Sequence, residues 1–231
     1  MFYNADERFA YCSTHKFLSA ALILQRKSRD ELNERKFFSA AEIVPYSPIT
    51  QAHVADGMTL AEICEAALRV SDNTAANLML TELGGVDAFK MSLRELGDDV
   101  TEPARLEPEL NIFAPDDIAD TSTPRQLAKD LELFMLGDVL SDDKKILLTE
   151  WLSNNTITDK LIKSGVPDGW QVLDKSGGGI NYGTRNDIAL VCPPNRKPIV
   201  VAIMTRRNEE SANFDSALVA DVARKIFTAP Q

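Results

Sequence analysis

The stretch RFAYCSTHKFLSAALIL, residues 8–24, places a serine, a histidine and a lysine directly ahead of a long apolar run. The run is too apolar for a surface helix, which carries a polar face. If the helix begins near Ser13, Lys16 lies one turn along on the same side, and the two side chains come within hydrogen-bond reach. We therefore expect a buried helix with reactive groups in its first turn.

A lysine in that position could activate the serine. Apolar neighbours remove water from the amine, which lowers its pKa from about 10.4 and lets the neutral form accept the serine proton. The helix N-terminus would stabilise negative charge on an attacked carbonyl. The sequence thus indicates Ser13 as a nucleophile and Lys16 as a base.

Length and composition fit a globular protein with one core or two small domains. The chain has 231 residues, of which 44% are hydrophobic and 26% charged. A net charge of −10 without a basic block argues against a nucleic-acid partner. No apolar run approaches the ~18 residues of a membrane span. The N-terminus shows no signal-peptide pattern, so the sequence as written predicts a cytoplasmic protein.

Cysteine and histidine are scarce. The odd number of cysteines leaves at least one free thiol and is too small for a disulfide scaffold. With the histidines they form no zinc-ligand spacing. We expect neither a metal nor a cofactor. The residues concerned are Cys12, Cys64, Cys192, His15 and His53.

Helices are predicted in the middle of the chain and strands near its end. Capping signals start helices after Thr59, where Glu62 completes a capping box, and after Thr123, where proline follows. Short β-branched segments at 170–177, 186–194 and 197–207 are typical of strands. A last helix is expected over roughly 211–227, with Phe214, Leu218, Val222 and Ile226 on its buried face.

Three short motifs each occur twice, and one set has ordinary explanations. Ser141, in the Ser-x-x-Lys pattern of residues 141–144, is a predicted helix N-cap followed by two aspartates that would oppose an oxyanion. Ser-x-Asn recurs at 153–155. Lys-Ser-Gly recurs at 163–165 ahead of a turn, where no strand would hold the lysine.

The other set has chemical contexts. Residues 13–16 open an apolar helix, 71–73 follow a capped helix, and 175–177 end a strand. With the segments 5–14, 56–80, 105–111 (RLEPELN), 120–131 and 174–194, they resemble a class A β-lactamase over nearly the whole chain. The resemblance implies a hydrolase that opens the four-membered ring of β-lactam antibiotics through an acyl-serine, giving antibiotic resistance.

The resemblance also assigns catalytic roles. Ser13 would attack the lactam carbonyl, and Lys16 or Glu107 would take the first proton. The backbone amides of Ser13 and Gly178 would form the oxyanion hole. Gly178 can approach closely because it has no side chain. Ser71 would protonate the departing ring nitrogen, and Glu107 would activate the deacylating water. The catalytic residues implied are Ser13, Lys16, Ser71, Glu107 and Gly178.

Other matching residues would bind substrate or hold the loop around Glu107. Lys175, Ser176 and Arg185 match the group that would receive the substrate carboxylate, since two cations and a hydroxyl suit an anion. Asn73 would hold the substrate side-chain amide, and Arg105 and Asp120 match an ion pair that closes an Ω-loop. Glu109 is expected to be a structural or solvent-facing carboxylate, and His15 to be a bystander. The substrate-binding residues implied are Tyr46, Asn73, Asn111, Lys175, Ser176, Gly177 and Arg185.

The fold class implied is α/β (α+β), an all-helical domain packed on an antiparallel sheet flanked by helices. The expected boundaries are 6–154 for the helical domain with the Ω-loop, and 1–5 with 155–231 for the sheet domain. The protein is expected to be a monomer without family disulfides. Compared with the family, the sequence is expected to lack a signal, an N-terminal helix and a first strand, although the family implies a periplasmic or secreted location.

Two alternatives stay open on the sequence. A penicillin-binding D-Ala-D-Ala peptidase shares the serine, lysine and Lys-Ser-Gly motifs, but RLEPELN weighs against it because such peptidases generally lack the glutamate. The chain could also be an inactive truncated remnant or a penicillin-binding sensor. A complete set of catalytic side chains argues against decay, whereas the short start argues for it.

Overall fold

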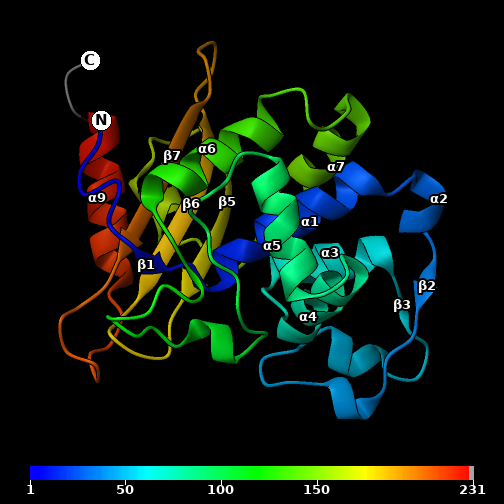
Figure 1. The fold of residues 1–231 in the computed structure, drawn as a ribbon. Helices are drawn as coiled ribbons and strands as arrows, with labels where there is room; N and C mark the ends of the chain where they lie inside the picture. The colour runs from blue at the N-terminus through cyan, green and yellow to red at the C-terminus, as the bar shows by residue number, and fades with distance from the viewer. Residues whose placement is uncertain (229–231) are drawn as a thin grey trace.

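The computed structural model describes residues 1–228, in which a group of helices packs beside a small β-sheet (Figure 1). The helices are α1 (His15–Arg26), α2 (Arg29–Leu32), α3 (Leu60–Arg69), α4 (Asn73–Glu82), α5 (Val86–Glu95), α6 (Pro124–Met135), α7 (Asp142–Ser153), α8 (Ile162–Gly165) and α9 (Ser216–Thr228). The strands are β1 (Phe9–Ala10), β2 (Arg35–Lys36), β3 (Met58–Thr59), β4 (Thr121–Ser122), β5 (Gln171–Gly178), β6 (Arg185–Cys192) and β7 (Ile199–Thr205).

The main sheet has the order β5-β6-β7, with antiparallel neighbours. Lys175 pairs with Ile188 and Ile188 with Ala202. The three strands predicted near the end of the chain are therefore confirmed. Two further pairs, β1-β4 and β2-β3, are only two residues long in each strand and tie together segments distant in sequence.

Helices cover both faces of the main sheet (Figure 1). On one face, buried residues of β6 and β7 such as Ala189 and Ile203 pack against α8 and α9. On the other face, Ile188, Leu190 and Met204 join the main core, and α6 packs on β6 and β7. Helix α6 lies within the predicted helical domain, 6–154, and yet packs on the sheet, so the two parts share an extensive contact. The division at 154 stays a prediction.

The central helix of the helical part is α1. Ten consecutive residues from His15 to Leu24 are buried, so α1 has no exposed face over that length. Helices α3, α4 and α7 surround it. The buried helix expected from residues 8–24 is confirmed, and its burial removes Lys16 from water.

The predicted helix starts are confirmed in detail at two places. Thr59 accepts a hydrogen bond from the amide of Glu62, whose side chain bonds back to the Thr59 amide. Thr123 accepts from the amide of Gln126, and proline occupies the first turn of α6. These local signals fix where α3 and α6 begin because they satisfy amides that have no partner within the helix.

The last helix begins later than predicted, at Ser216 rather than near 211. Asp215 is the reason, since its carboxylate accepts a hydrogen bond from the amide of Leu218 and caps the helix. Phe214 therefore precedes α9 and is 53% exposed. The fully buried residues of α9 are Val219, Ala220, Ala223 and Phe227, while Val222 and Ile226 of the predicted face are half-buried against the same cluster.

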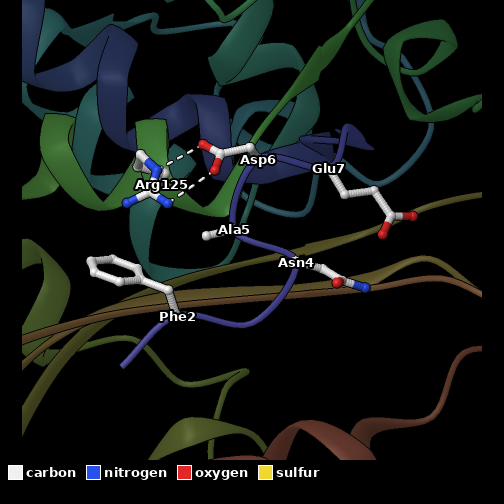
Figure 2. A pocket seen from close by; sticks show the side chains of 6 residues that line it. All are labelled: Phe2, Asn4, Ala5, Asp6, Glu7 and Arg125. Atoms are coloured by element: carbon white, nitrogen blue, oxygen red, sulfur yellow. Dashed lines mark hydrogen bonds and ion pairs between the residues drawn. The ribbon is translucent and has the colours of Figure 1, made fainter.

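The N-terminal segment lies along α6 and lines a shallow hollow there (Figure 2). The guanidinium of Arg125 donates to both carboxylate oxygens of Asp6, at 2.7 and 2.9 Å, and lies 4.4 Å from the centre of the Phe2 ring. The amide of Arg125 donates to the Ala5 carbonyl. These contacts connect the start of the chain to α6 beside the sheet.

All three cysteines are free, as the predicted absence of family disulfides requires. Within residues 1–228, no helix has the length and apolar character needed to cross a membrane.

Candidate active site

Ser13 lies in a 3-10 turn, Cys12–Thr14, that precedes α1. The Thr14 hydroxyl donates to the Tyr11 carbonyl at 2.7 Å and closes the turn. Strand β5 packs directly on it. A Cβ atom on Gly177 would lie 2.8 Å from the Tyr11 carbonyl oxygen and 3.0 Å from Cys12 Cβ. Glycine at 177 is therefore what lets β5 approach the serine.

Gly178 is less closely packed than Gly177. A Cβ atom on Gly178 would have a tight contact only with the Arg185 side chain, at 3.2 Å. Gly178 ends β5 opposite Arg185, beside the turn that carries Ser13. Its predicted role concerns its amide, which stays a prediction.

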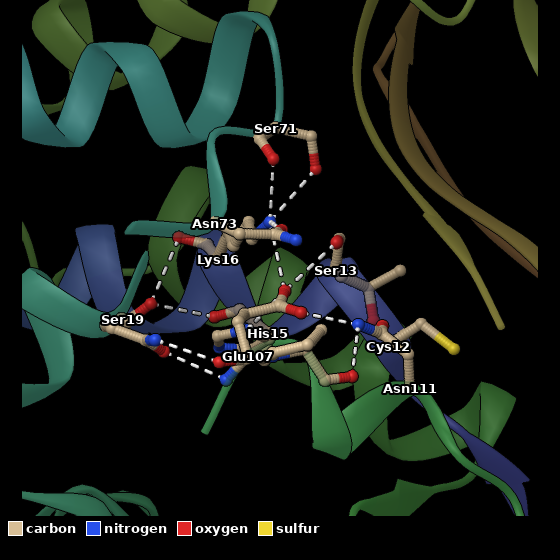
Figure 3. Close-up of polar contacts among 12 residues, drawn as sticks. Cys12, Ser13, His15, Lys16, Ser19, Ser71, Asn73, Glu107 and Asn111 are labelled. Atoms are coloured by element: carbon tan, nitrogen blue, oxygen red, sulfur yellow. Dashed lines mark hydrogen bonds and ion pairs between the residues drawn. The ribbon is translucent and has the colours of Figure 1, made fainter. Parts of the chain in front are cut away.

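The buried Lys16 amine connects three segments of the chain (Figure 3). It donates to the Ser71 carbonyl at 2.8 Å, the Ser71 hydroxyl at 3.2 Å and Asn73 Oδ1 at 2.6 Å. It also forms an ion pair with Glu107 Oε1 at 3.0 Å. Lys16 thus lies at the centre of the predicted site.

The expected direct contact between Ser13 and Lys16 is not formed. Within the described part of the chain no hydrogen bond joins them, because α1 begins at His15 and Ser13 belongs to the preceding 3-10 turn. The Ser13 hydroxyl donates instead to Glu107 Oε1, at 3.3 Å. The same carboxylate oxygen therefore serves both the predicted nucleophile and the predicted base.

Glu107 is positioned by two asparagines. The Asn77 side chain accepts from the Glu107 amide at 2.9 Å and donates to the Glu107 carbonyl at 3.0 Å. Asn111 donates to Glu107 Oε2. Asn111 was predicted, but Asn77 was missed. Its only signal in the sequence is its place one turn after Asn73 on the same helix face.

The buried charges favour an ionised Glu107. Burial alone would raise its pKa, but the Lys16 ammonium and contact with His15 outweigh burial and hold the pKa well below its usual range. Burial also lowers the pKa of Lys16, and Glu107 opposes this shift. Glu107 is therefore a carboxylate in the free protein and can accept a proton.

Ser71 lies between two lysines. Its hydroxyl accepts from Lys16 at 3.2 Å and from Lys175 at 3.1 Å. Because both amines donate to it, the Ser71 proton can point to a substrate. Burial and the nearby Lys16 lower the pKa of Lys175 to about 7. The backbone of Ser71 is left-handed, with φ of 59°, which turns this residue out of the preceding helix and into the site.

Asp72, which the sequence did not single out, holds the loop that carries Tyr46. Its buried carboxylate accepts from the amides of Ile49 and Thr50 and from the Thr50 hydroxyl, and it caps α4 through Ala75. Four bonds to one carboxylate fix that loop to the start of α4.

Tyr46 stands at the rim, 58% exposed. Its carbonyl accepts from the Asn73 amide at 3.0 Å. The Asn73 side chain donates to the Pro45 carbonyl at 2.9 Å and accepts from Lys16, so both of its polar ends already have protein partners. The predicted contacts of Tyr46 and Asn73 with substrate stay predictions.

The predicted carboxylate-binding group lies at the ends of two neighbouring strands. Lys175 and Ser176 are buried on β5, and Lys175 also donates to the Ser176 carbonyl at 2.8 Å. Arg185 begins β6, opposite Gly178, and its guanidinium is 5.1 Å from the centre of the Phe214 ring. The structure thus brings these cations to the same end of the sheet as Ser13.

The predicted Ω-loop ion pair is present. Arg105 Nε donates to Asp120 Oδ2 at 2.5 Å. The other oxygen of the fully buried Asp120 accepts from the amides of Ala104 and Arg105 and from the Tyr11 hydroxyl, at 2.7 to 3.1 Å. Asp120 therefore connects both ends of the loop to the turn that carries Ser13. Glu109 is exposed, as expected.

The second set of motifs forms no such constellation. Ser141 is the N-cap residue of α7, as predicted, although its hydroxyl donates to Asp143 at 2.6 Å rather than accepting a backbone bond. Ser153 donates to the Glu150 carbonyl. Lys163 lies in the short helix α8 and pairs with Asp159.

His15, which the sequence suggested to be a bystander, lies beside the predicted base. It is buried, and its Nε2 lies 3.5 Å from Glu107 Oε1. The contact depends on the Ω-loop returning over α1, which no local pattern reveals.

Comparison with known proteins matches this geometry. The model of the β-lactamase enzyme family matches residues 1–229. The chain is 51% identical to β-lactamases from Bacillus subtilis and Haemophilus influenzae (ROB-1), covering 97% of this chain and 73% of each relative.

Solved structures agree with the sequence relatives. The class A β-lactamase from Clostridium kluyveri superposes with a TM-score of 0.96 at 48% identity, over 98% of this chain and 86% of that one. The β-lactamase from Streptomyces albus G gives 0.95 at 40% identity, over 98% and 87%. With the serine, the two lysines and the glutamate gathered in one site, the chain belongs to the class A β-lactamases.

Proposed function

We propose that this hydrolase opens β-lactams with Ser13 as the nucleophile and Glu107 as the base for deacylation. The contact that carries the proposal is Glu107 Oε1, which lies 3.3 Å from the Ser13 hydroxyl and 3.0 Å from the Lys16 amine. An ionised carboxylate at that distance can accept a proton from the serine or from a water molecule nearby.

In acylation, the Ser13 oxygen attacks the lactam carbonyl and its proton passes to the pair of Glu107 and Lys16. The helix N-terminus and the amides of Ser13 and Gly178 would stabilise the oxyanion. As the carbon–nitrogen bond of the ring breaks, Ser71 gives its proton to the nitrogen and regains one from Lys16, which passes on the proton taken from Ser13 and leaves Glu107 ionised. The Ser71 proton is available because Lys16 and Lys175 both donate to its oxygen.

In deacylation, Glu107 takes a proton from water, and the resulting hydroxide attacks the ester carbon. The Ser13 oxygen leaves and regains a proton, which restores the enzyme and releases the ring-opened acid. Asn111, which donates to Glu107 Oε2, would hold the water together with the carboxylate.

The alternatives are less well supported. A peptidase would not need a carboxylate placed against the serine, and relatives at about half identity are named β-lactamases. An inactive remnant would not need the lysines, serines and glutamate kept in mutual contact.

Nitrocefin hydrolysis by the purified protein tests the proposal. We expect steady turnover and, in the presence of a penicillin, a mass adduct on the peptide that contains Ser13. Acylation without turnover would favour a penicillin-binding sensor. Absence of both turnover and adduct would contradict the proposal.

We also propose that the protein is a monomer and acts in the periplasm or outside the cell, as the resemblance implies. Sedimentation at several concentrations tests the first point. Fractionation of cells that express the natural gene tests the second.

A further inference from the structure

His15 occupies a dry position beside the proposed general base. Its side chain is 1% exposed and lies between two aromatic rings, with centroids 5.7 Å away at Tyr11 and 6.4 Å away at Phe89. Figure 3 shows it at the centre of the polar cluster, next to Glu107 and Lys16. A phenylalanine would fill such a position without burying a polar atom, so the imidazole has an energetic cost.

The ring nitrogen that faces Glu107 has no hydrogen bond. Nε2 lies 3.5 Å from Glu107 Oε1, too far for a formed bond, and among the described residues it has no other partner. A buried donor without a partner is unfavourable. A shift of about half an ångström would give Nε2 a bond of ordinary length with Oε1.

The oxygen it faces loses a donor during the reaction. In the free protein Oε1 accepts from the Ser13 hydroxyl and from Lys16. Once Ser13 is acylated, its oxygen is part of an ester and has no proton to donate. We propose that His15 is a positioning residue for deacylation, whose Nε2–H replaces the lost Ser13 donor on Glu107 Oε1 in the acyl-enzyme. This inference rests on the proposed roles of Ser13 and Glu107.

The charges around His15 favour its neutral form. Burial lowers its pKa, with smaller contributions in the same direction from Lys16 and Lys175, while the Glu107 carboxylate opposes the shift. The turn before α1 contributes Cys12 and Tyr11, both neutral because burial raises their pKa values. Asp120 accepts from the Tyr11 hydroxyl, and α5 contributes the Phe89 ring. A neutral imidazole with its proton on Nε2 can therefore donate to Glu107 at neutral pH.

A donor on Oε1 stabilises the ionised form of Glu107 and fixes the direction of its carboxylate. Removing it should raise the pKa of Glu107 in the acyl-enzyme, so the acid limb of deacylation should move to higher pH. Acylation should change little, because Ser13 and Lys16 still donate to Oε1 at that stage. A role in packing alone would not separate the two steps in this way.

The test compares His15→Phe, which keeps an aromatic ring and removes the donor, with His15→Gln, which keeps an N–H at a similar distance. His53→Phe is the matched control, since the His53 side chain is half-exposed and, in the described part of the chain, bonds only Asp56. Rates of acylation and deacylation are measured separately by stopped flow with nitrocefin from pH 3 to 8, because the acid limb of a carboxylate with a lowered pKa lies below pH 4.5. Melting temperatures establish that each variant is folded over this range.

We expect His15→Phe to move the acid limb of deacylation upward by about 0.5 to 1 pH unit. Its acylation rate should stay within about threefold of wild type, and His15→Gln should restore most of the deacylation rate. An unchanged acid limb, or equal loss in both steps, would overturn the inference. So would a glutamine variant no better than phenylalanine.

Glu107→Gln separates this inference from the proposed function. If that variant deacylates normally, the proposed role of Glu107 fails, whatever His15 does. If it accumulates acyl-enzyme while His15→Phe matches wild type, only the inference about His15 fails.

Discussion

Two regions of this chain carry a serine three residues ahead of a lysine at the start of a helix, and of these two serines only Ser13 lies in the candidate active site. At α1, Ser13 bonds the buried Glu107, and Lys16 is buried among four oxygen atoms. At α7, the exposed Ser141 bonds Asp143. In each region the serine hydroxyl donates to a carboxylate, so the two regions share both the Ser-x-x-Lys pattern and this hydrogen bond.

The difference lies in what distant segments contribute. Within residues 1–228, the Lys144 amine donates only to the Lys27 carbonyl, at 2.7 Å, and it is partly in water. Around Lys16, the start of α4, the Ω-loop and β5 converge and exclude water. In a dry site each charge acts more strongly on its neighbours than it does at the surface. The reactivity expected of Ser13 therefore depends more on the distant segments that pack around Lys16 than on the Ser-x-x-Lys pattern itself.

The largest expected contrast is between the two serines. Ser13→Ala should lower nitrocefin turnover by about 10⁴-fold or more, as for loss of a nucleophile in other hydrolases. Ser141→Ala should keep wild-type turnover, because its hydroxyl faces solvent. Peptide mass spectrometry after penicillin treatment checks the assignment. An adduct that survives Ser13→Ala would break the comparison.

The next contrast is between the two carboxylates that the serines bond. Glu107→Ala should still be acylated but should lower turnover by about 10²-fold or more through slow deacylation. Asp143→Ala should turn over normally. Mass spectra of the intact protein during turnover should show acyl-enzyme only in the first variant. Unchanged turnover in Glu107→Ala would remove the distinction between the regions.

Much of this contrast could be predicted from sequence. Caps at Thr59 and Thr123, three β-branched segments and the apolar run after Lys16 are local signals, and the structure confirms each of them. The motifs that begin at Ser13, Ser71 and Lys175 lie at the ends of predicted elements, whereas Glu107 and Arg185 follow from the resemblance to the family. The apolar run after Lys16 and the two aspartates after Ser141 distinguish the two serines in the sequence alone.

The rest depends on contacts that sequence does not encode locally. The approach of Gly177 to the turn, the clamp of Asn77 on Glu107 and the burial of His15 against the Ω-loop all join segments distant in the chain. The late start of α9 is different. The prediction followed the apolar spacing from Phe214, whereas the structure starts the helix after Asp215, whose carboxylate accepts from the Leu218 amide.

Ion pairs give a smaller contrast between the same regions. Asp120→Asn should lower the free energy of unfolding by about 2 to 4 kcal/mol, because it breaks the ion pair between Arg105 and the fully buried carboxylate of Asp120. Asp143→Asn should leave the urea midpoint unchanged, since its pair with Arg29 is mostly exposed. Urea unfolding followed by fluorescence measures both. Equal midpoints in the two variants would show that burial does not distinguish these pairs.

The smallest expected effect concerns the lysines and pH. Burial and Lys16 lower the pKa of Lys175 to about 7, so the free enzyme loses this ammonium as the pH rises above neutrality. For a substrate that bears a carboxylate, kcat/KM should fall by about three- to tenfold between pH 7 and 9, while Arg185 keeps its charge. Lys175→Arg should flatten that limb because a guanidinium stays protonated.

Lys144→Arg is the matched change in the other region. Burial also lowers the pKa of Lys144, yet this amine contacts only a carbonyl remote from Ser13, so the pH profile should not move. Because kcat/KM reports groups of the free enzyme, the Lys175 limb should be weaker in kcat, where bound carboxylate keeps the lysine protonated. If the fall in kcat/KM at high pH persists in Lys175→Arg, another group causes it. The buried Lys175 and the surface Lys144 would then not differ in their effect on activity at alkaline pH.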